Sequence, residues 1–91
     1  MERREVKNVR YSRRFVRQLS RLPLRIVREA QTKENIFKKD SCDSRLRTHK
    51  LHGRDAGAWA FSVDHSYRVK FIFVGEGEVV FLEVGTHDIY Q

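Results

Sequence analysis

Four histidines and one arginine are the residues of this chain whose types and places suggest chemistry. The histidines are His49, His52, His65 and His87. An imidazole exchanges protons near neutral pH, so each histidine is a candidate acid or base. Arg68 lies between Tyr67 and Val69, and a strand would turn its side chain away from both neighbours. An arginine that faces a groove or the interior needs an anionic partner, so these residue types predict proton transfer beside a bound anion.

The single cysteine excludes two kinds of site. With only Cys42 available, no internal disulfide can form and no thiolate metal cluster is possible. We expect Cys42 to be an unreactive loop thiol, because nothing near it in the sequence activates a thiolate beyond general positive charge. The sequence predicts no metal site and no cofactor.

Positive charge is concentrated in the first part of the chain. Residues 1–54 carry 17 Lys and Arg against 6 Asp and Glu, whereas residues 55–91 carry 2 against 6, within a net charge of +7. A surface of this sign attracts phosphate backbones and acidic partners. The alternative is that these charges only keep helix surfaces soluble.

Length and hydropathy limit the class of protein. Ninety-one residues make one domain, 1–91, with a single modest core. No apolar run approaches the roughly 20 residues that span a bilayer, and the first residues lack the apolar stretch of a secretory signal. We therefore expect a cytoplasmic protein that does not enter a membrane.

Two helices must position the basic residues. A short first strand is expected within residues 6–11, and Ser12 then provides an N-cap for the first helix. The apolar residues behind it recur at helical spacing: Phe15, Val16, Leu19 and Leu22. Four arginines occupy the other face: Arg13, Arg14, Arg17 and Arg21. Pro23 suits the first turn of a second helix, which should end near Lys39.

A period of two replaces the helical period from Leu46 onward, which predicts strands. Residues 59–63 and 67–74 alternate, and residues 79–84 are almost continuously apolar. Residues 64–66 and 75–78 are the expected hairpin turns: DHS and GEGE. A short extra strand is expected within residues 48–51.

This order of elements, β-α-α-β-β-β, predicts a two-layer α+β fold. The helical hairpin must bury its apolar stripe against one face of a twisted antiparallel sheet, while the other face can stay open to solvent or a ligand. We expect Trp59 to join the core, with stacking on a nucleic-acid base as the alternative.

Three segments together resemble the RelE/ParE toxin superfamily. They are residues 46–53 (LRTHKLHG), residues 59–63 (WAFSV) running into residues 67–69 (YRV), and residues 85–90 (GTHDIY). The helical segment before Pro23 also fits, so the resemblance covers nearly the whole chain. It implies the RelE/ParE-like fold, and it implies a toxin that a cognate antitoxin protein holds inactive.

The resemblance also implies a metal-independent way of cutting RNA. A base removes the 2′-hydroxyl proton, a cation stabilises the pentacoordinate phosphorane, and an acid protonates the departing 5′-oxygen. His49 falls where the resemblance implies a general base or phosphate ligand, and His87 where it implies a general acid. Arg68 matches a phosphate-binding arginine. Tyr90 would stack on a base or donate its phenol, or else pack onto the sheet.

Each catalytic candidate also has a structural interpretation. His49 could be a solvent-facing strand histidine, and His87 could close the C-terminal turn through a hydrogen bond. Arg68 could form an ion pair with Glu83 or Asp64.

Further RNA contacts are expected around these residues. Lys50, His52 and Lys70 would add charge to the site, and parity places His49 and Lys50 on opposite faces of a strand. The basic face of the first helix would dock on ribosomal RNA through Arg13, Arg14, Arg17 and Arg21.

Members of the superfamily differ in activity, and the histidines of this chain favour one branch. The chain lacks the lysine and arginine density of the RelE type and looks closer to YafQ and YoeB, although the YoeB-type glutamate has no clear counterpart. We therefore expect a type II toxin that cleaves mRNA on the ribosome, in contact with 16S rRNA and in a hetero-oligomer with its antitoxin. The alternatives are a ParE-like inhibitor of DNA gyrase and a non-catalytic homologue that binds RNA or an antitoxin.

Overall fold

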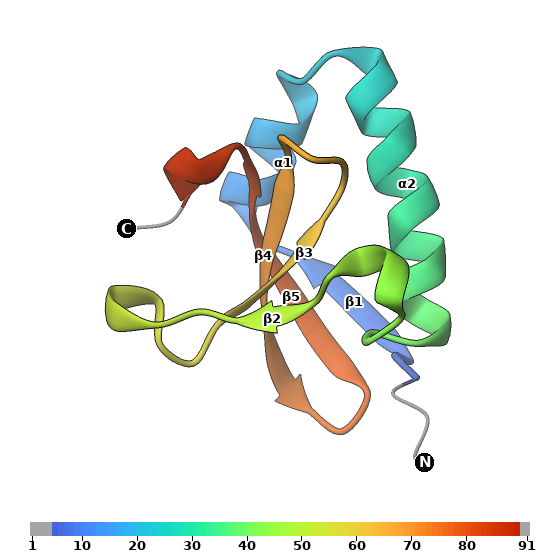
Figure 1. The fold of residues 1–91 in the computed structure, drawn as a ribbon, viewed down its shortest axis with the longest axis vertical. Coiled ribbons are helices and arrows are strands. Elements are labelled where there is room, and N and C mark those ends of the chain that lie inside the picture. The colour runs from blue at the N-terminus through green and yellow to red at the C-terminus, as the bar shows by residue number, and fades with distance from the viewer. Residues whose placement is uncertain (1–4, 90–91) are drawn as a thin grey trace.

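The computed structural model describes residues 5–89, and its elements follow the two periodicities of the sequence. The helices are α1 (Arg13–Ser20) and α2 (Leu24–Lys39). The strands are β1 (Asn8–Tyr11), β2 (His49–Lys50), β3 (Trp59–Ser62), β4 (Arg68–Gly75) and β5 (Glu78–Gly85). Three short 3-10 turns complete the chain: η1 (Ser44–Leu46), η2 (Gly53–Asp55) and η3 (His87–Ile89) (Figure 1).

Both helices begin where the sequence predicts. The Ser12 hydroxyl accepts a hydrogen bond from the Phe15 N–H at 3.0 Å and donates one to the Leu82 carbonyl at 2.7 Å. One side chain therefore caps α1 and ties it to β5. Pro23 is the N-cap residue of α2. Val16 was expected in the buried stripe but is 55% exposed, because α1 lies along the edge of β5 and turns Phe15 inward.

The five strands form one sheet in the order β1-β5-β4-β3-β2. Strands β2 to β5 are antiparallel neighbours, as predicted, and β2 is the extra strand expected within residues 48–51. The predicted two-layer α+β fold is confirmed, but the sheet is mixed and not antiparallel throughout, because β1 pairs parallel to β5, with Asn8 opposite Glu78. The helical hairpin separates β1 from the other strands, so no tight turn fixes its direction.

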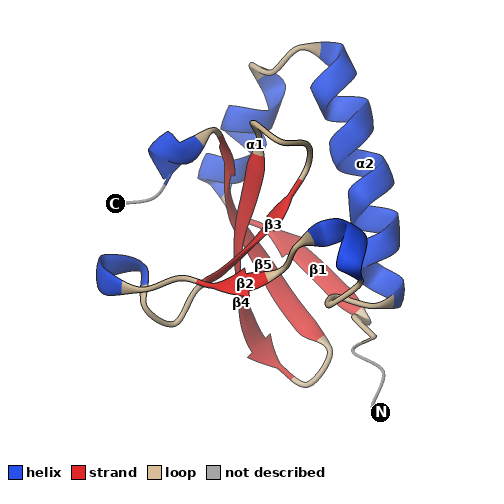
Figure 2. Ribbon diagram, viewed as in Figure 1, coloured by secondary structure: helices blue, strands red, loops and turns tan. Residues whose placement is uncertain are grey.

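The two faces of the sheet have different surroundings. Figure 2 shows α2 running along one side of the sheet, whereas η2 and η3 project from the opposite side. Within residues 5–89, no helix combines the length and the apolar character needed to cross a bilayer.

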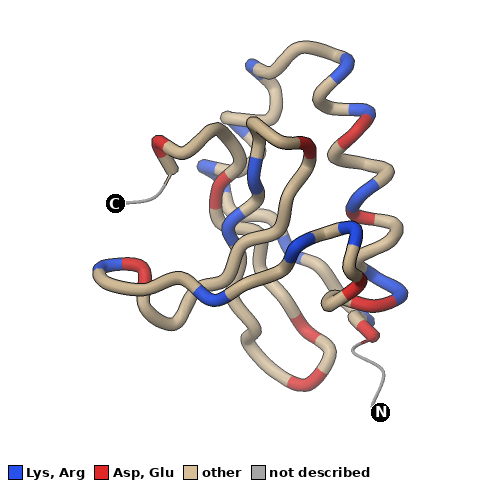
Figure 3. The backbone as a smooth tube through the Cα atoms, viewed as in Figure 1, with Lys and Arg blue, Asp and Glu red and all other residues tan. Residues whose placement is uncertain are grey.

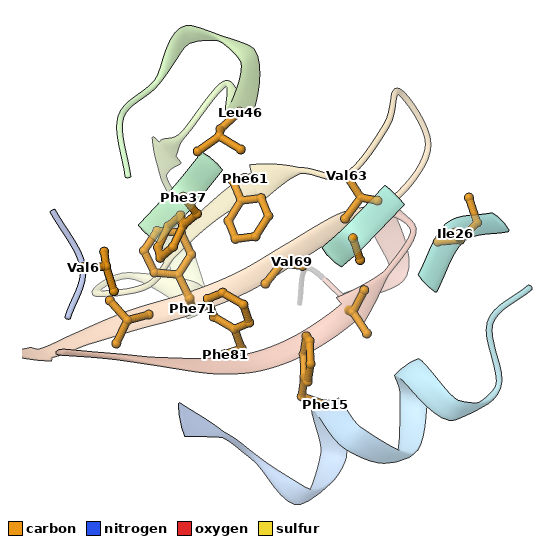
Figure 4. Packing of buried hydrophobic residues seen from close by; sticks show 13 residues of the cluster. Val6, Phe15, Ile26, Phe37, Leu46, Phe61, Val63, Val69, Phe71 and Phe81 are labelled. Atoms are coloured by element: carbon orange, nitrogen blue, oxygen red, sulfur yellow. The ribbon is translucent and has the colours of Figure 1, made fainter. Parts of the chain in front are cut away.

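Aromatic rings fill the space between the sheet and the helices. The ring of Phe37, on α2, lies 4.9 Å from the rings of Phe61 and Phe71 and 5.5 Å from that of Phe81, centroid to centroid. All four residues are almost completely buried, and Figure 4 shows them meeting at the centre of the core.

A polar contact holds β1 to α2. The Tyr11 hydroxyl donates a hydrogen bond to the Glu34 carboxylate, and the Lys38 ammonium lies 3.6 Å from the same carboxylate. Burial of the phenol and its hydrogen bond to the Glu34 carboxylate raise the pKa of Tyr11 to about 12. The phenol therefore keeps its proton at neutral pH, and the contact persists.

Phe37 should be the core side chain whose removal lowers the free energy of unfolding most. Phe37→Ala would empty a site enclosed by three rings and should lower the free energy of unfolding by about 3–5 kcal/mol, as measured by urea denaturation. Val16→Ala, at an exposed position of α1, is the control and should change it by less than about 0.5 kcal/mol. Equal effects of the two substitutions would contradict this account of the core.

Candidate functional site

A row of side chains crosses the sheet on the face opposite the core. The strand register pairs His49 with Ala60, Ala60 with Lys70, and Lys70 with Glu83. Directly opposed residues share a face, and the neighbours of Lys70, Val69 and Phe71, point into the core. We call this side the polar face of the sheet.

Arg68 belongs to the same face, two residues before Lys70. It opposes Ser62 on one side and Gly85 on the other. Its Nη1 donates a hydrogen bond to the backbone carbonyl of Asp64 at 2.8 Å. The structural alternative for Arg68 is wrong, because no ion pair within residues 5–89 joins it to Glu83 or to the Asp64 carboxylate.

A backbone carbonyl fixes the ring of His49. Its Nδ1 lies 2.9 Å from the Arg47 carbonyl oxygen, which can only accept, so Nδ1 carries the proton. In the neutral ring Nε2 then holds a free lone pair. The side chain is exposed on β2, at the edge of the sheet. His49 is therefore oriented as a base and is open to a ligand.

The chain brings His87 to this face through a close packing contact. His87 begins η3, two residues after Gly85, and its side chain is exposed. A Cβ atom on Gly85 would lie 2.9 Å from Cγ2 of Ile89, so only glycine lets η3 fold back so closely. Tyr90 lies outside the described residues.

Lys70 occupies the centre of the polar face but is not an exposed cation. Its Nζ lies 2.7 Å from Glu83 Oε2 and donates hydrogen bonds to Asp55 Oδ1 at 3.0 Å and to the Ile89 carbonyl at 3.1 Å. Only 6% of the residue is exposed. The expectation that Lys70 offers its charge to RNA is therefore wrong, because Asp55 and Glu83 already pair with the ammonium group. The face is closed over Lys70 rather than open throughout.

Burial alone would lower the pKa of the Lys70 ammonium. The hydrogen bonds and charges of Glu83 and Asp55 outweigh burial, and the pKa lies above its ordinary value of 10.5. A lysine with a raised pKa contributes its stability fully below the unfolded-state pKa and loses it as the pH rises through the folded-state value. The ion pairs are therefore intact across the neutral range.

Lys50 points to the other side of β2, as parity predicts. It pairs with Trp59, and its Nζ lies 5.5 Å from the centroid of the Trp59 ring. Trp59 itself is partly buried at the margin of the core, edge-on to Phe73. Lys50 is thus separated from His49 by the sheet.

The remaining predicted contacts are exposed. His52 is exposed and precedes η2, whose Asp55 accepts a hydrogen bond from Lys70 on the polar face. The α1 arginines all face outward: Arg13, Arg14, Arg17 and, just after the helix, Arg21. Arg14 lies 3.8 Å from Glu83, which places this end of α1 beside the polar face.

Comparison with known proteins finds the same architecture in solved structures. A YoeB/ParE toxin from Agrobacterium tumefaciens superposes with a TM-score of 0.76 over 89% of this chain and 99% of its own, at 15% identity. A chain of a RelBE toxin–antitoxin complex from Mycobacterium tuberculosis gives 0.71 over 91% and 93%, at 22% identity. YafQ from E. coli gives 0.68 over 91% and 96%, at 14% identity. This chain has the RelE/ParE toxin fold. No protein-family model and no curated protein matches the sequence.

The RelE/ParE-like fold of this chain contains a basic cavity that the sequence did not predict. The cavity, of about 260 Å³, is lined by Arg68 and by Lys33, Arg45, Arg47, Asp64 and His65, among others. Lys33 comes from α2, and the other basic residues come from η1, its C-cap and the β3–β4 turn. Lys33 is far in the sequence from Arg45 and Arg47, and no periodic pattern links the three residues. Their proximity can therefore be seen only in the folded chain.

The cavity does not unite the three predicted catalytic residues, since neither His49 nor His87 lines it. The expected convergence is thus met only in part: His49 and Arg68 share the polar face, and η3 carries His87 beside it. Within residues 5–89, no three His, Cys, Asp or Glu side chains gather where they could hold a metal ion. Cys42 is exposed and free.

The tautomer of His49 can be observed directly. We expect long-range ¹H–¹⁵N correlation spectra above pH 8 to show the proton of the neutral ring on Nδ1, because that atom donates to the Arg47 carbonyl. The exposed imidazole of His52, in the same spectrum, is the comparison. A dominant Nε2–H form for His49 would mean that its lone pair points away from the solvent-exposed side.

The Lys70 ion pairs should carry measurable stability. Lys70→Met would leave Asp55 and Glu83 without their common partner and should cost about 3 kcal/mol in the free energy of unfolding at pH 7. The matched control is Lys50→Met, at an exposed lysine on the other side of the sheet. If urea denaturation gave the same midpoint for both variants, the polar face would not depend on Lys70.

Proposed function

We propose that this chain is the toxin of a type II toxin–antitoxin system and that it cleaves mRNA on the ribosome. The observation that carries the proposal is the free Nε2 lone pair of His49 on the same sheet face as Arg68. A base and a guanidinium on one face are two of the three groups that RNA cleavage requires. The toxin fold supports the assignment.

The reaction is an internal transesterification. His49 Nε2 takes the proton of a ribose 2′-hydroxyl, and the 2′-oxygen attacks the adjacent phosphorus while the bond to the 5′-oxygen breaks. Arg68 stabilises the negative charge that develops on the phosphorane oxygens. His87 gives a proton to the leaving 5′-oxygen, and the products are a 2′,3′-cyclic phosphate and a 5′-hydroxyl. Tyr90 would stack on a base next to the cut.

Ribosomal RNA is the proposed docking partner of the basic surface. Figure 3 shows Lys and Arg on α1 and in the segment before β2. Arg14, one of the exposed α1 arginines, lies 3.8 Å from Glu83 at the polar face, so a phosphate backbone bound to α1 would run beside the substrate. His52 is proposed to contact the mRNA from the opposite side, where it precedes η2.

An antitoxin protein is the second proposed partner. The M. tuberculosis structure is a toxin–antitoxin complex, and its toxin-like fold supports a similar assembly here. An acidic segment of the antitoxin would cover the basic helices and the polar face, because it would replace phosphate as the partner of the same cations. We propose that this complex forms in the cytoplasm.

Arg68→Ala and His49→Ala should relieve growth arrest when the chain is expressed without an antitoxin. Loss of the base should slow cleavage by about 10²–10⁴-fold and loss of the guanidinium by about 10²-fold or more. Primer extension on total RNA would measure the cuts, and circular dichroism would confirm that each variant folds. Arg28→Ala, at an exposed α2 arginine far from this face in sequence and fold, is the matched control and should still cleave.

Two results would overturn the proposal. Intact transcripts in translating cells that express the wild-type chain would exclude cleavage. Arrest that induces the SOS response and persists in the His49→Ala and His87→Ala variants would instead indicate the ParE-like gyrase inhibitor, which needs no histidine pair.

A further inference from the structure

We infer that the basic cavity between α2, η1 and the β3–β4 turn binds a second phosphodiester group of an RNA strand. This inference rests on the proposed function, because it assigns a neighbouring phosphate of the RNA whose reacting phosphate lies on the polar face. Arg68 connects the two places. It opposes Ser62 on the polar face, and both residues also line the cavity, so the cavity adjoins that face at Arg68.

The cationic side chains around the cavity outnumber the carboxylates. Lys33, Arg45, Arg47 and Arg68 line it, against the single carboxylate of Asp64. That carboxylate is already engaged, because its Oδ1 accepts hydrogen bonds from two backbone N–H groups of the β3–β4 turn at 2.8 and 2.7 Å. Of the four cations, Arg47 and Arg68 form no ion pair within residues 5–89, so a bound anion would compensate two guanidinium charges that repel each other.

Two of these cations are held in place by carboxylates outside the cavity. Arg45 makes a two-pronged contact with Asp43, at 3.0 Å from Nε and 2.9 Å from Nη2. Lys33 Nζ lies 2.8 Å from Glu29 and donates to the Val63 carbonyl at 2.8 Å. Their positions are therefore fixed before an anion arrives, which reduces the entropy lost on binding.

Arg47 is the cation left for the ligand. Within residues 5–89 it forms no ion pair, and its backbone is the one non-glycine in that range with a positive φ, 52°. Such a conformation is costly for arginine and points to a functional constraint. The same residue holds His49 through its carbonyl, so its side chain serves the cavity while its backbone orients the candidate base.

The cavity continues along the surface, which favours a polymer over a single anion. Arg45 also lines a second cavity of about 240 Å³, together with Lys39, Asn35, Ile36 and its own partner Asp43. Adjacent cavities that share a cation can hold successive phosphates of one strand. Each exceeds the roughly 30 Å³ that a water molecule occupies in the liquid by several-fold, so a phosphate and part of its sugar fit.

The test measures binding rather than cleavage. The probe is a fluorescein-labelled ten-nucleotide 2′-O-methyl RNA, which lacks the attacking hydroxyl, and its affinity is measured by anisotropy over a range of salt concentrations. Arg47→Asn should weaken binding about tenfold and reduce the slope of log K against log salt by about 0.7, the contribution of one single-strand phosphate. Asn accepts the left-handed conformation, so the backbone should be retained.

Matched controls distinguish the effect of the Arg47 side chain from the effect of lower net charge and from that of a changed backbone. Arg28→Asn removes the same charge from an exposed position of α2 and should leave the slope unchanged. In Arg47→Asn the His49 ring should keep its proton on Nδ1, which shows that only the side chain was lost. Affinity and slope equal to wild type in Arg47→Asn, both for the oligonucleotide and for 70S ribosomes, would overturn the inference.

Two further arms identify the source of the phosphate and exclude a protein ligand. Arg47-dependent binding to ribosomes, with none to the oligonucleotide, would assign the phosphodiester to ribosomal RNA. Tighter Arg47-dependent binding of a ten-residue polyglutamate peptide would overturn the inference in favour of an acidic protein segment. Arg47-dependent RNA binding by a chain that never cleaves would retain the cavity assignment and overturn only the proposed ribonuclease.

Discussion

The ammonium group of Lys70 is the point on which the arrangement of the polar face depends. Its three partners belong to segments that are otherwise separate: Asp55 in η2, Glu83 in β5 and the Ile89 carbonyl in η3. The two 3-10 turns have few apolar anchors of their own, apart from Ile89. A buried cation with two anionic partners and one carbonyl joins both turns to the sheet, since movement of either turn would take a partner from the buried ammonium. His52 precedes the first of these turns, and His87 begins the second.

The mixed sheet explains how α1 reaches the polar face. Because β1 pairs with β5 only as far as Phe81, the last part of β5 has a free edge, and α1 covers it. Gln18 accepts a hydrogen bond from the Val84 N–H at 2.8 Å, and Ser12 donates to the Leu82 carbonyl. Side chains of a helix that covers a strand edge extend to both faces. Phe15 therefore enters the core, while Arg14 approaches Glu83 on the polar side.

The sequence predicted local features better than the contacts between distant segments. The Ser12 cap, the Pro23 start and the alternating strands follow from rules that act over a few residues, and the structure has them. The direction of β1 depends on a crossover and was predicted wrongly. Lys70 could not be distinguished from a solvated strand lysine, because its partners lie 15 and 13 residues away and η3 folds over it only through Gly85. The cavity around Arg68 was missed for the same reason: Lys33, Arg45 and Arg47 meet only in three dimensions.

The places of the acidic residues decide where an anion can bind. Six Asp and Glu in residues 55–91 oppose only two basic residues there, so the sequence alone suggests an acidic sheet. Asp55 and Glu83, however, share Lys70 as a partner, and Arg14 also lies 3.8 Å from Glu83. The Asp64 carboxylate accepts hydrogen bonds from backbone N–H groups, and Asp88 belongs to η3. Glu76 and Glu78 lie in or beside the β4–β5 turn, at the far end of β4 from Arg68, about 23 Å away at 3.3 Å per residue. At the end of the sheet that carries Arg68, the basic residues of α2 and η1 thus outnumber Asp64, the one carboxylate that lines the cavity, and this balance favours a phosphate backbone.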